Sequence, residues 1–269
     1  MIRRWIAIVA LFLCVTVHAE ETKRPVVRLA SLEWPPYSTN SLPEQGMTSA
    51  VIRAAFAAVG YDVQIDIYPW SRTVRLGEDG ASGYAGYFPR YYNEATASKT
   101  VYSPSVGEGP LGFVENIAHP VTWNTLDDLR GLTIGIVKDY ANTEEFDRRV
   151  AAGELQVAET MSDRSNVLKI GYARQDLAVV DPNVLNYLIR HDQDVDQIAD
   201  EIRMNGHLLE IKQLYVAFNL DNVALAEIFR QGLARIDVRQ TELEYMFRVH
   251  PELRRAGIKS INEINGIQP

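Results

Sequence analysis

Residues 126–145 read LDDLRGLTIGIVKDYANTEE, and this stretch decides the class of fold that the chain can adopt. The run Leu132–Val137 is short, apolar and rich in β-branched residues, which is typical of a buried strand. Asn142–Glu145 then has the capping-box pattern of a helix N-terminus, and Gly153 is placed to end that helix. A buried strand followed at once by a capped helix is the unit of an α/β fold with mainly parallel sheets.

The same unit occurs before and after this stretch. Near the start, Val26–Ala30 reads as a strand, and Met47, Val51, Ala54 and Ala58 then share one face at helical spacing. Later, Leu177–Val180 reads as a buried strand, and Asp181-Pro182 predicts a helix start because proline is favoured in the first turn. The sequence therefore predicts an α/β protein made of two such units.

Extended segments predict where the chain crosses between the two units. Gly112–Asn116 lies between them, while Leu208–Lys212 and Leu214–Phe218 precede a helical last part. We therefore expect a double crossing, with a cleft between two lobes that is lined by loops at the carboxyl ends of parallel strands. The predicted boundaries are residues 20–114 and 213–269 for lobe 1 and residues 115–212 for lobe 2.

The first residues have the pattern of a secretory signal peptide, which we place at residues 1–19. Arg3 and Arg4 precede the apolar run Ile6–Val17, and a small-residue cleavage site ends at Ala19. The run is shorter than the roughly 20 residues needed to cross a bilayer, so a retained anchor is the weaker alternative. We expect cleavage after Ala19 and a periplasmic protein.

Charge and cysteine content exclude several classes of function. The chain has 27 basic and 35 acidic residues, and loss of two arginines with the leader changes its net charge from −8 to −10, which argues against nucleic acid as a partner. The single cysteine, Cys14, would be lost with the leader, so no disulfide or thiolate site remains. The histidines lack metal-ligand spacing, and no phosphate loop or nucleophile elbow occurs, so we expect neither metal nor cofactor.

Six motifs, taken in order, resemble those of a known family. They are Trp34-Pro35-Pro36-Tyr37, Gly46-Met47, Tyr68-Pro69-Trp70-Ser71-Arg72, Val101-Tyr102-Ser103-Pro104, the stretch 126–135 and Val179-Val180-Asp181-Pro182. In order and spacing they resemble the bacterial extracellular solute-binding proteins of the polar amino-acid type, family 3. The resemblance covers nearly all of the mature chain.

The resemblance implies a type II periplasmic-binding-protein-like fold whose two lobes close by hinge motion on a small polar, amino-acid-like ligand. It also implies delivery of that ligand to an inner-membrane ABC transporter, without catalysis. We expect a monomer. In physical terms, the ligand touches both lobes only in the closed form and so shifts the population toward it.

The resemblance also suggests ligand contacts in lobe 1. Tyr37 matches an aromatic residue that packs on the ligand, and Trp34 and Trp70 lie at corresponding strand ends, although all three could instead pack in the lobe cores or cover the hinge. Arg90 is the candidate for an anionic group, because a guanidinium offers a planar fork to a carboxylate. The alternative for Arg90 is a structural salt bridge. Tyr87 and Phe88 align with pocket-lining positions of the family.

In lobe 2, residues 139–143 match the turn where the family presents backbone N–H groups to a ligand carboxylate. The candidates there are Asp139, Tyr140, Ala141 and Asn142. Asn142 or Thr143 could instead cap the helix that follows. Asp181 matches the aspartate that receives the ligand's ammonium group, and it is also a good N-cap, two roles that can coexist.

Two other functions share this architecture. One is a periplasmic dehydratase, for which Glu33, Asp139 and Asp181 are the candidate acids or bases. The other is a sensor whose closed form docks on a membrane kinase instead of a transporter. Turnover of a bound acid would favour the dehydratase, and genomic neighbours would identify the sensor.

Overall fold

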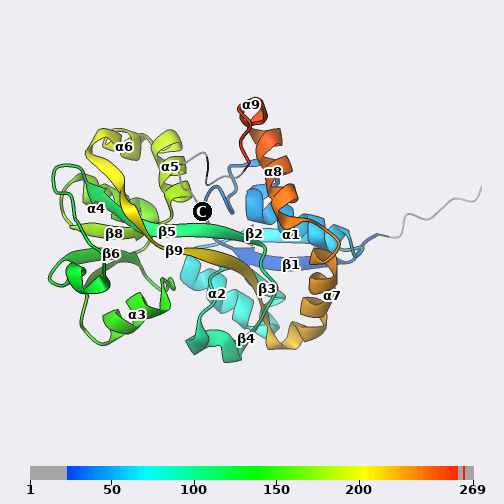
Figure 1. Ribbon diagram of the computed structural model, residues 1–269. Coiled ribbons are helices and arrows are strands. Elements are labelled where there is room, and N and C mark those ends of the chain that lie inside the picture. Colours follow the sequence, from blue (N-terminus) through cyan, green and yellow to red (C-terminus); the bar gives the residue numbers. More distant parts are fainter. Residues whose placement is uncertain (1–22, 260–262, 264–269) are drawn as a thin grey trace, which may run out of the picture.

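The structure is a computed structural model that describes residues 23–259 and residue 263 (Figure 1). The predicted signal peptide, with Cys14, lies outside the described residues. Over the described ranges, no helix combines the length and the apolar character that crossing a membrane requires.

Lobe 1 consists of three strands in parallel register, a short fourth strand and five helices. Strand β1 pairs in parallel with β2 on one side and with β3 on the other. The strands are β1 (Val26–Ser31), β2 (Asp62–Ile67), β3 (Gly86–Arg90) and β4 (Thr100–Tyr102). The helices are α1 (Met47–Ala57), α2 (Trp70–Glu78), α7 (Val223–Leu233), α8 (Val238–Val249) and α9 (Pro251–Arg255).

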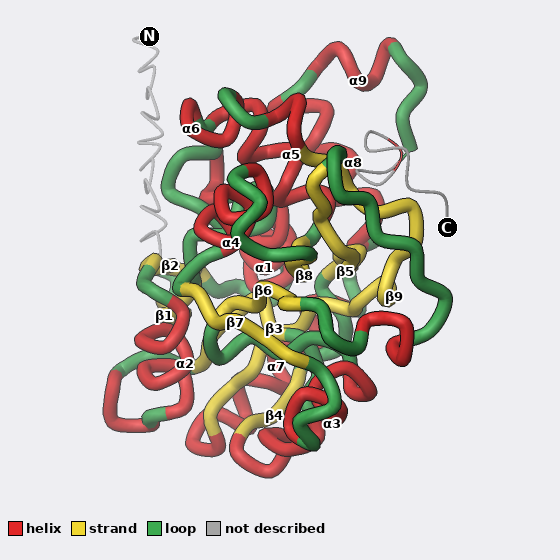
Figure 2. Tube along the Cα trace, turned by 90° about the vertical axis from the view of Figure 1, so that its left-hand side faces the viewer, coloured by secondary structure: helices red, strands yellow, loops and turns green. Residues whose placement is uncertain are grey.

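Lobe 2 repeats this plan with β6 pairing in parallel with β7 and β8. Its strands are β6 (Thr133–Val137), β7 (Gln156–Thr160) and β8 (Leu177–Val180). Its helices are α3 (Glu144–Ala151), α4 (Asp163–Gly171), α5 (Pro182–His191) and α6 (Gln193–Asp196). Figures 1 and 2 show α4, α5 and α6 on one face of these strands and α3 on the other, so the sheet is covered on both faces.

Two long strands connect the lobes. They are β5 (Gly107–Asn116) and β9 (Ile202–Asn219), and they pair in antiparallel fashion from Gly107↔Leu214 to Asn116↔Ile202. Together they join all strands in the order β2-β1-β3-β9-β5-β8-β6-β7, with β4 on β9. Figure 1 shows both strands running from one lobe into the other. The predicted boundaries at residues 114/115 and 212/213 fall within these strands, and they remain a prediction.

Apolar clusters fill both lobes, and one of them continues from lobe 1 into lobe 2. In lobe 1, the rings of Phe56 from α1 and Phe229 from α7 lie 4.7 Å apart, and both side chains are fully buried. In lobe 2, Phe113 and Phe146 pack in one cluster and Ile170 of α4 in another. Val184 of α5 belongs to the same cluster as Phe56 and Phe229, so apolar packing also holds the two lobes together.

One local expectation differs from the structure. The two extended segments expected at 208–212 and 214–218 form one continuous strand, β9, because its pairing with β5 continues through Glu210, Lys212 and Gln213.

Candidate ligand-binding cleft

The ends of several strands meet where the two lobes face each other. The turn after β1, the start of α2 and the end of β3 come from lobe 1, and the loop after β6 comes from lobe 2. A small cavity of about 30 Å³ lies between them. Its lining residues are Leu32, Trp34, Trp70, Pro89, Arg90, Tyr91, Tyr140, Ala141 and Leu214. We call this space the cleft cavity.

Four of the nine residues that line the cleft cavity have aromatic rings. Trp34 stacks on Tyr37 with ring centroids 4.5 Å apart, and Tyr91 meets Trp34 edge-on at 6.1 Å. Trp70 of lobe 1 meets Tyr140 of lobe 2 edge-on at 5.6 Å. Such walls suit the apolar part of a ligand or a cation placed over a ring face.

Direct hydrogen bonds join the lobes at two places. The Tyr37 hydroxyl donates to Asp181 Oδ2 at 2.8 Å and accepts from Asn183 Nδ2 at 2.7 Å. Across the cleft cavity, Trp70 Nε1 donates to the carbonyl of Asp139 at 2.9 Å, and Ser71 donates to Asp139 Oδ2 at 2.6 Å. The lobes are therefore closed on each other.

Asp181 has the capping role that its sequence context predicts, and its second oxygen faces lobe 1. It caps α5, because its Oδ1 accepts from the backbone N–H groups of Asn183 at 2.6 Å and Val184 at 3.3 Å, while Oδ2 faces Tyr37. Asp181 is 1% exposed, and burial raises the pKa of its carboxyl to about 8. Within the described chain it has no cationic partner.

Arg90 is a buried cation without a carboxylate partner among the described residues. It is 5% exposed, and Nη2 donates to Thr96 at 2.8 Å while Nε reaches the Tyr102 hydroxyl at 3.4 Å. Its guanidinium lies over the rings of Trp70 and Tyr87, at 5.8 and 5.6 Å. Because a buried charge is costly unless it is paired, Arg90 is suited to receive an anionic group.

The other predicted contacts divide into two groups. Tyr140 and Ala141 line the cleft cavity, together with Trp34 and Trp70. Tyr87 and Phe88 are fully buried in lobe 1 and do not line it.

The loop after β6 is held by its own polar contacts. Asn142 bonds to Asp147 through both its backbone N–H and its side chain, each at 2.9 Å. The cap of α3 is Thr143, whose hydroxyl accepts from the backbone N–H of Phe146 at 3.2 Å. Asp139 has a φ of +63°, a conformation in which aspartate is one of the better tolerated non-glycine residues.

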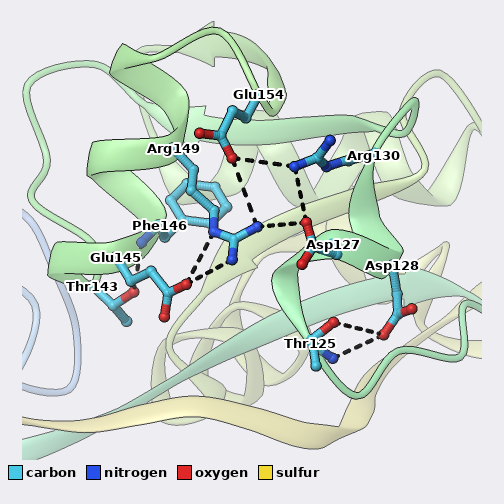
Figure 3. Close-up of polar contacts among 9 residues, drawn as sticks. All are labelled: Thr125, Asp127, Asp128, Arg130, Thr143, Glu145, Phe146, Arg149 and Glu154. Atoms are coloured by element: carbon cyan, nitrogen blue, oxygen red, sulfur yellow. Dashed lines mark hydrogen bonds and ion pairs between the residues drawn. The ribbon is translucent and has the colours of Figure 1, made fainter.

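An ion-pair network fixes helix α3 in lobe 2 (Figure 3). At its centre, Arg149 lies 2.9 Å from Asp127 Oδ1 and 2.8 Å from Glu145 Oε1. Arg130 bridges Asp127 and Glu154, at 3.0 and 3.4 Å. The network joins α3 to the turn that opens lobe 2, so the loop that precedes α3 starts from a fixed position.

Sequence reasoning missed two residues of this region. Tyr91 follows Arg90 directly and lines the cleft cavity, with a buried hydroxyl that has no hydrogen-bond partner. Asp163 is 8% exposed at the start of α4, and burial raises the pKa of its carboxyl to about 7. Burial is the main cause of the raised pKa values of Tyr91, Tyr140 and Asp181, and the charge of Asp163 raises them further.

No metal site is evident over the residues that the structure describes, since no group of three or more His, Cys, Asp or Glu side chains could hold an ion there. The chemistry available in the cleft is therefore that of aromatic faces, one guanidinium, buried carboxyls and backbone groups.

Comparison with known proteins identifies the class of fold. No protein-family model matches the sequence, and no curated protein matches it. In structure, however, the chain has the type II periplasmic-binding-protein-like fold, two-lobed with a double crossing, as the resemblance predicted. The structural neighbours are consistently of the kind found among family 3 solute-binding proteins.

Three neighbours illustrate the range of this fold. A histidine kinase sensor domain with similarity to periplasmic binding proteins has a TM-score of 0.68 and 18% identity, covering 87% of this chain and 96% of its own. An ancestral arginine-binding protein bound to arginine has a TM-score of 0.66 and 14% identity, with coverages of 84% and 99%. An ancestral amino acid-binding protein, described as a precursor of cyclohexadienyl dehydratase, has a TM-score of 0.64 and 12% identity, with coverages of 83% and 94%.

Proposed function

We propose that this protein is a periplasmic solute-binding protein that captures a small, amino-acid-like zwitterion between its lobes and delivers it to an ABC transporter. One observation carries the proposal: Arg90 of lobe 1, which lines the cleft cavity, is a nearly buried cation, Asp181 of lobe 2 is a nearly buried carboxyl, and neither has an ion-pair partner among the described residues. A zwitterion bound between the lobes would satisfy both groups at once.

In this proposal, closure of the two lobes makes the protein selective for ligands that bridge them. A ligand that bridges Arg90 and Asp181 binds the closed form better than the open form, so it shifts the population toward closure by its difference in affinity. The aromatic walls then exclude water, which strengthens the charge interactions inside. No catalytic step is needed.

The proposal is tested by substitutions that keep side-chain size. Arg90→Gln removes the cation, and Asp181→Asn removes the anion while retaining an N-cap, since asparagine caps about as well as aspartate. Thermal-shift screening of the mature protein against amino acids, small carboxylates, polyamines and sugars should find a ligand, which at 100 times its Kd stabilises by about 2.7 kcal/mol. Both variants should lose that stabilisation but keep the melting temperature of the protein without added ligand within a few degrees.

Unchanged ligand binding in both variants would refute the assignment of these two residues. Failure of every zwitterion in the screen, with a different class of solute binding instead, would refute the proposed function itself. As a control, Arg235→Gln removes one exposed cation from lobe 1, well away from the lining of the cleft cavity.

Export and partnership are part of the same proposal. The leader pattern at residues 1–19 supports a periplasmic location, and the fold is shared with proteins that bind small ligands. We propose a monomer. Stimulation of a reconstituted permease by the ligand-loaded protein would test delivery.

A sensor is the second candidate function, because one structural neighbour is a histidine kinase sensor domain. The transport and sensor functions differ in the membrane partner that binds the closed form. If the liganded protein binds a purified membrane kinase and alters its autophosphorylation, while no permease responds to it, the sensor is favoured.

A dehydratase is less well supported by the geometry. Glu33 is engaged by Thr39 and by the backbone of Asn40, and Asp139 accepts from Ser71. Asp181 alone combines burial with a raised pKa near the cleft. Product analysis after incubation with cyclic hydroxy acids would reveal turnover, which the proposed binding function does not include.

A further inference from the structure

The hydrogen bond from Tyr37 to Asp181 joins the lobes at the carboxyl that the proposed ligand needs. Tyr37, Asp181 and Asn183 are 0%, 1% and 2% exposed, so this contact is shielded from water. Strand β5 encloses it from a third side, because a Cβ atom added at Gly109 would lie 2.7 Å from Asp181 Oδ2. The oxygen of Asp181 that faces lobe 1 is therefore occupied by a side chain of the protein itself.

Both partners of this bond are fixed within their own lobes. The carbonyl of Tyr37 accepts from the backbone N–H of Thr48 near the start of α1 at 2.9 Å, and the Tyr37 ring stacks on Trp34. Asp181 is held as the N-cap of α5 through its other oxygen, Oδ1. Because each group is held in place in its own lobe, the distance between the Tyr37 hydroxyl and Asp181 Oδ2 depends on how far the lobes are closed.

The second polar contact between the lobes is the weaker of the two. Trp70 and Ser71 donate to Asp139, but Asp139 is exposed, so water competes for the same groups. The Tyr37 hydroxyl has two partners in a buried setting, where the loss of a partner costs the desolvation energy of the group left behind. Tyr37 therefore contributes more than Asp139 to the stability of this closed arrangement.

The closed arrangement also leaves little room for a ligand. The cleft cavity of about 30 Å³ has space for about two water molecules. Pockets that enclose small organic molecules typically measure about 300–1,000 Å³. A zwitterion that bridges Arg90 and Asp181 therefore requires that the lobes first move apart and that Tyr37 leave Asp181.

We propose that Tyr37 is an internal competitor of the ligand: its hydroxyl occupies Asp181 in a self-closed form, and a ligand binds only when its ammonium group takes the place of that hydroxyl. The inference rests on the proposed function, because it concerns the regulation of the same site. The self-closed form lowers the apparent affinity in proportion to the fraction of molecules that adopt it. The protein then responds only above a threshold concentration of ligand.

The exchange at Asp181 favours a charged group over a neutral one. The Tyr37 hydroxyl is a neutral donor, whereas an ammonium group makes a charge-assisted hydrogen bond that is about twice as strong. A ligand with an ammonium group can therefore displace Tyr37. A ligand that offers only a hydroxyl at this point gains nothing over the bond that it must replace.

The test measures how the affinity for ligand changes when the competitor is removed. The standard L-amino acids are titrated one at a time into the unmodified mature protein and into Tyr37→Phe by isothermal titration calorimetry. Every amino acid that binds the unmodified protein should bind Tyr37→Phe at least about fivefold more tightly, because the self-closed form no longer competes. A residue that only supports the fold or packs on the ligand would give weaker binding when changed.

Tyr61→Phe is the matched control, since Tyr61 packs against Phe56 within lobe 1 and its hydroxyl is not part of the contact with Asp181. It should leave every affinity unchanged. If Tyr37→Phe binds the same amino acids equally or more weakly, the inference is wrong but the proposed function stands. If no amino acid or other zwitterion binds either protein, the proposed function fails.

A second measurement needs neither ligand nor variant, and it decides the matter if Tyr37→Phe does not fold. Small-angle scattering of the unmodified mature protein without added ligand should give the radius of gyration of the closed structure, which is roughly 18 Å for a compact body of this size. A clearly larger radius, which decreases when a ligand is added, would show that the lobes rest apart. That result would overturn the self-closed form and leave the proposed function standing.

Discussion

At the scale of single residues, Tyr37 connects the lobes through one hydroxyl that both donates and accepts. We expect Tyr37→Phe to weaken the closed form by about 1–3 kcal/mol, since Asp181 and Asn183 each lose a buried partner. Small-angle scattering without added ligand should then give a radius of gyration above the roughly 18 Å of a compact body of about 250 residues.

The control for this prediction is Tyr172→Phe, which removes a hydroxyl from a half-exposed ring of lobe 2. Its scattering should match that of the unmodified protein. If Tyr37→Phe also leaves the scattering unchanged, the hydroxyl does not hold the lobes together.

Residues differed in how well the sequence predicted them. Asp181 could be proposed because an aspartate before proline at a strand end has few roles, and the structure shows it as the N-cap of α5. Asp163 gave no such signal, because an acidic residue after a serine is ordinary at the start of any helix. Its burial arises from tertiary packing, which sequence order does not reveal.

At the scale of elements, strand β5 passes so close to Asp181 that it requires a glycine. A Cβ atom added at Gly109 would lie 2.7 Å from Asp181 Oδ2 and 3.1 Å from the Tyr37 hydroxyl. We therefore expect Gly109→Ala to separate these two groups and to destabilise the closed protein by about 1–3 kcal/mol, with a matching loss of ligand affinity. Melting temperature and calorimetric affinity measure the two effects.

Strand β9 offers the comparison for this substitution. A Cβ atom at Gly206 would meet nothing within 4 Å, so Gly206→Ala should change stability by no more than about 0.5 kcal/mol. Equal effects of the two substitutions would show that the cost arises from the strand backbone and not from the contact with Asp181.

Elements with a clear local signal were predicted well. The strand at 132–137 and the helix start at Asp181-Pro182 depend on a few adjacent residues, and each lies where expected. Strand β9 was divided in two, because its solvent-facing polar residues resemble a break when its partner β5 is not known. The prediction of elements therefore failed where long-range strand pairing determines the structure, and it succeeded where local propensity does.

At the scale of the whole molecule, buried carboxyls make stability depend on pH. Burial raises the pKa values of Asp181, Asp163 and Glu242 to about 8, 7 and 8, well above those of the unfolded chain. Between about pH 4 and pH 8 the folded protein holds protons that the unfolded chain has released. The free energy of unfolding should therefore fall as pH rises through this window.

Chemical unfolding without added ligand at pH 5.5, 6.5, 7.5 and 8.5 measures this trend. Around Asp181, the groups that face it are Tyr37, Asn183 and Asp163, none of which carries a positive charge. Asp181→Asn should flatten the curve because the amide does not titrate. A stability that rises from pH 5.5 to pH 8.5 would contradict the assignment of these carboxyls as buried and unpaired.

The overall architecture was predictable because it repeats. Two strand-helix units separated by extended segments were sufficient to predict two lobes with a double crossing, and the structure has them. The contents of the cleft were predicted only in part, because they depend on how two surfaces distant in sequence meet. The hydrogen bond from Tyr37 to Asp181 is one such contact, since the two residues lie 144 positions apart in the sequence.

The route of the chain also determines where the protein can be attached without harm. Strand β1 and helix α9, the first and last elements described, both belong to lobe 1, whereas lobe 2 is reached and left through β5 and β9 alone within the described chain. A tag, fluorophore or surface linker fused at either end therefore immobilises the same half. Lobe 2 is left unattached, and the lobe closure proposed above would make such a tethered protein an optical reporter of its ligand.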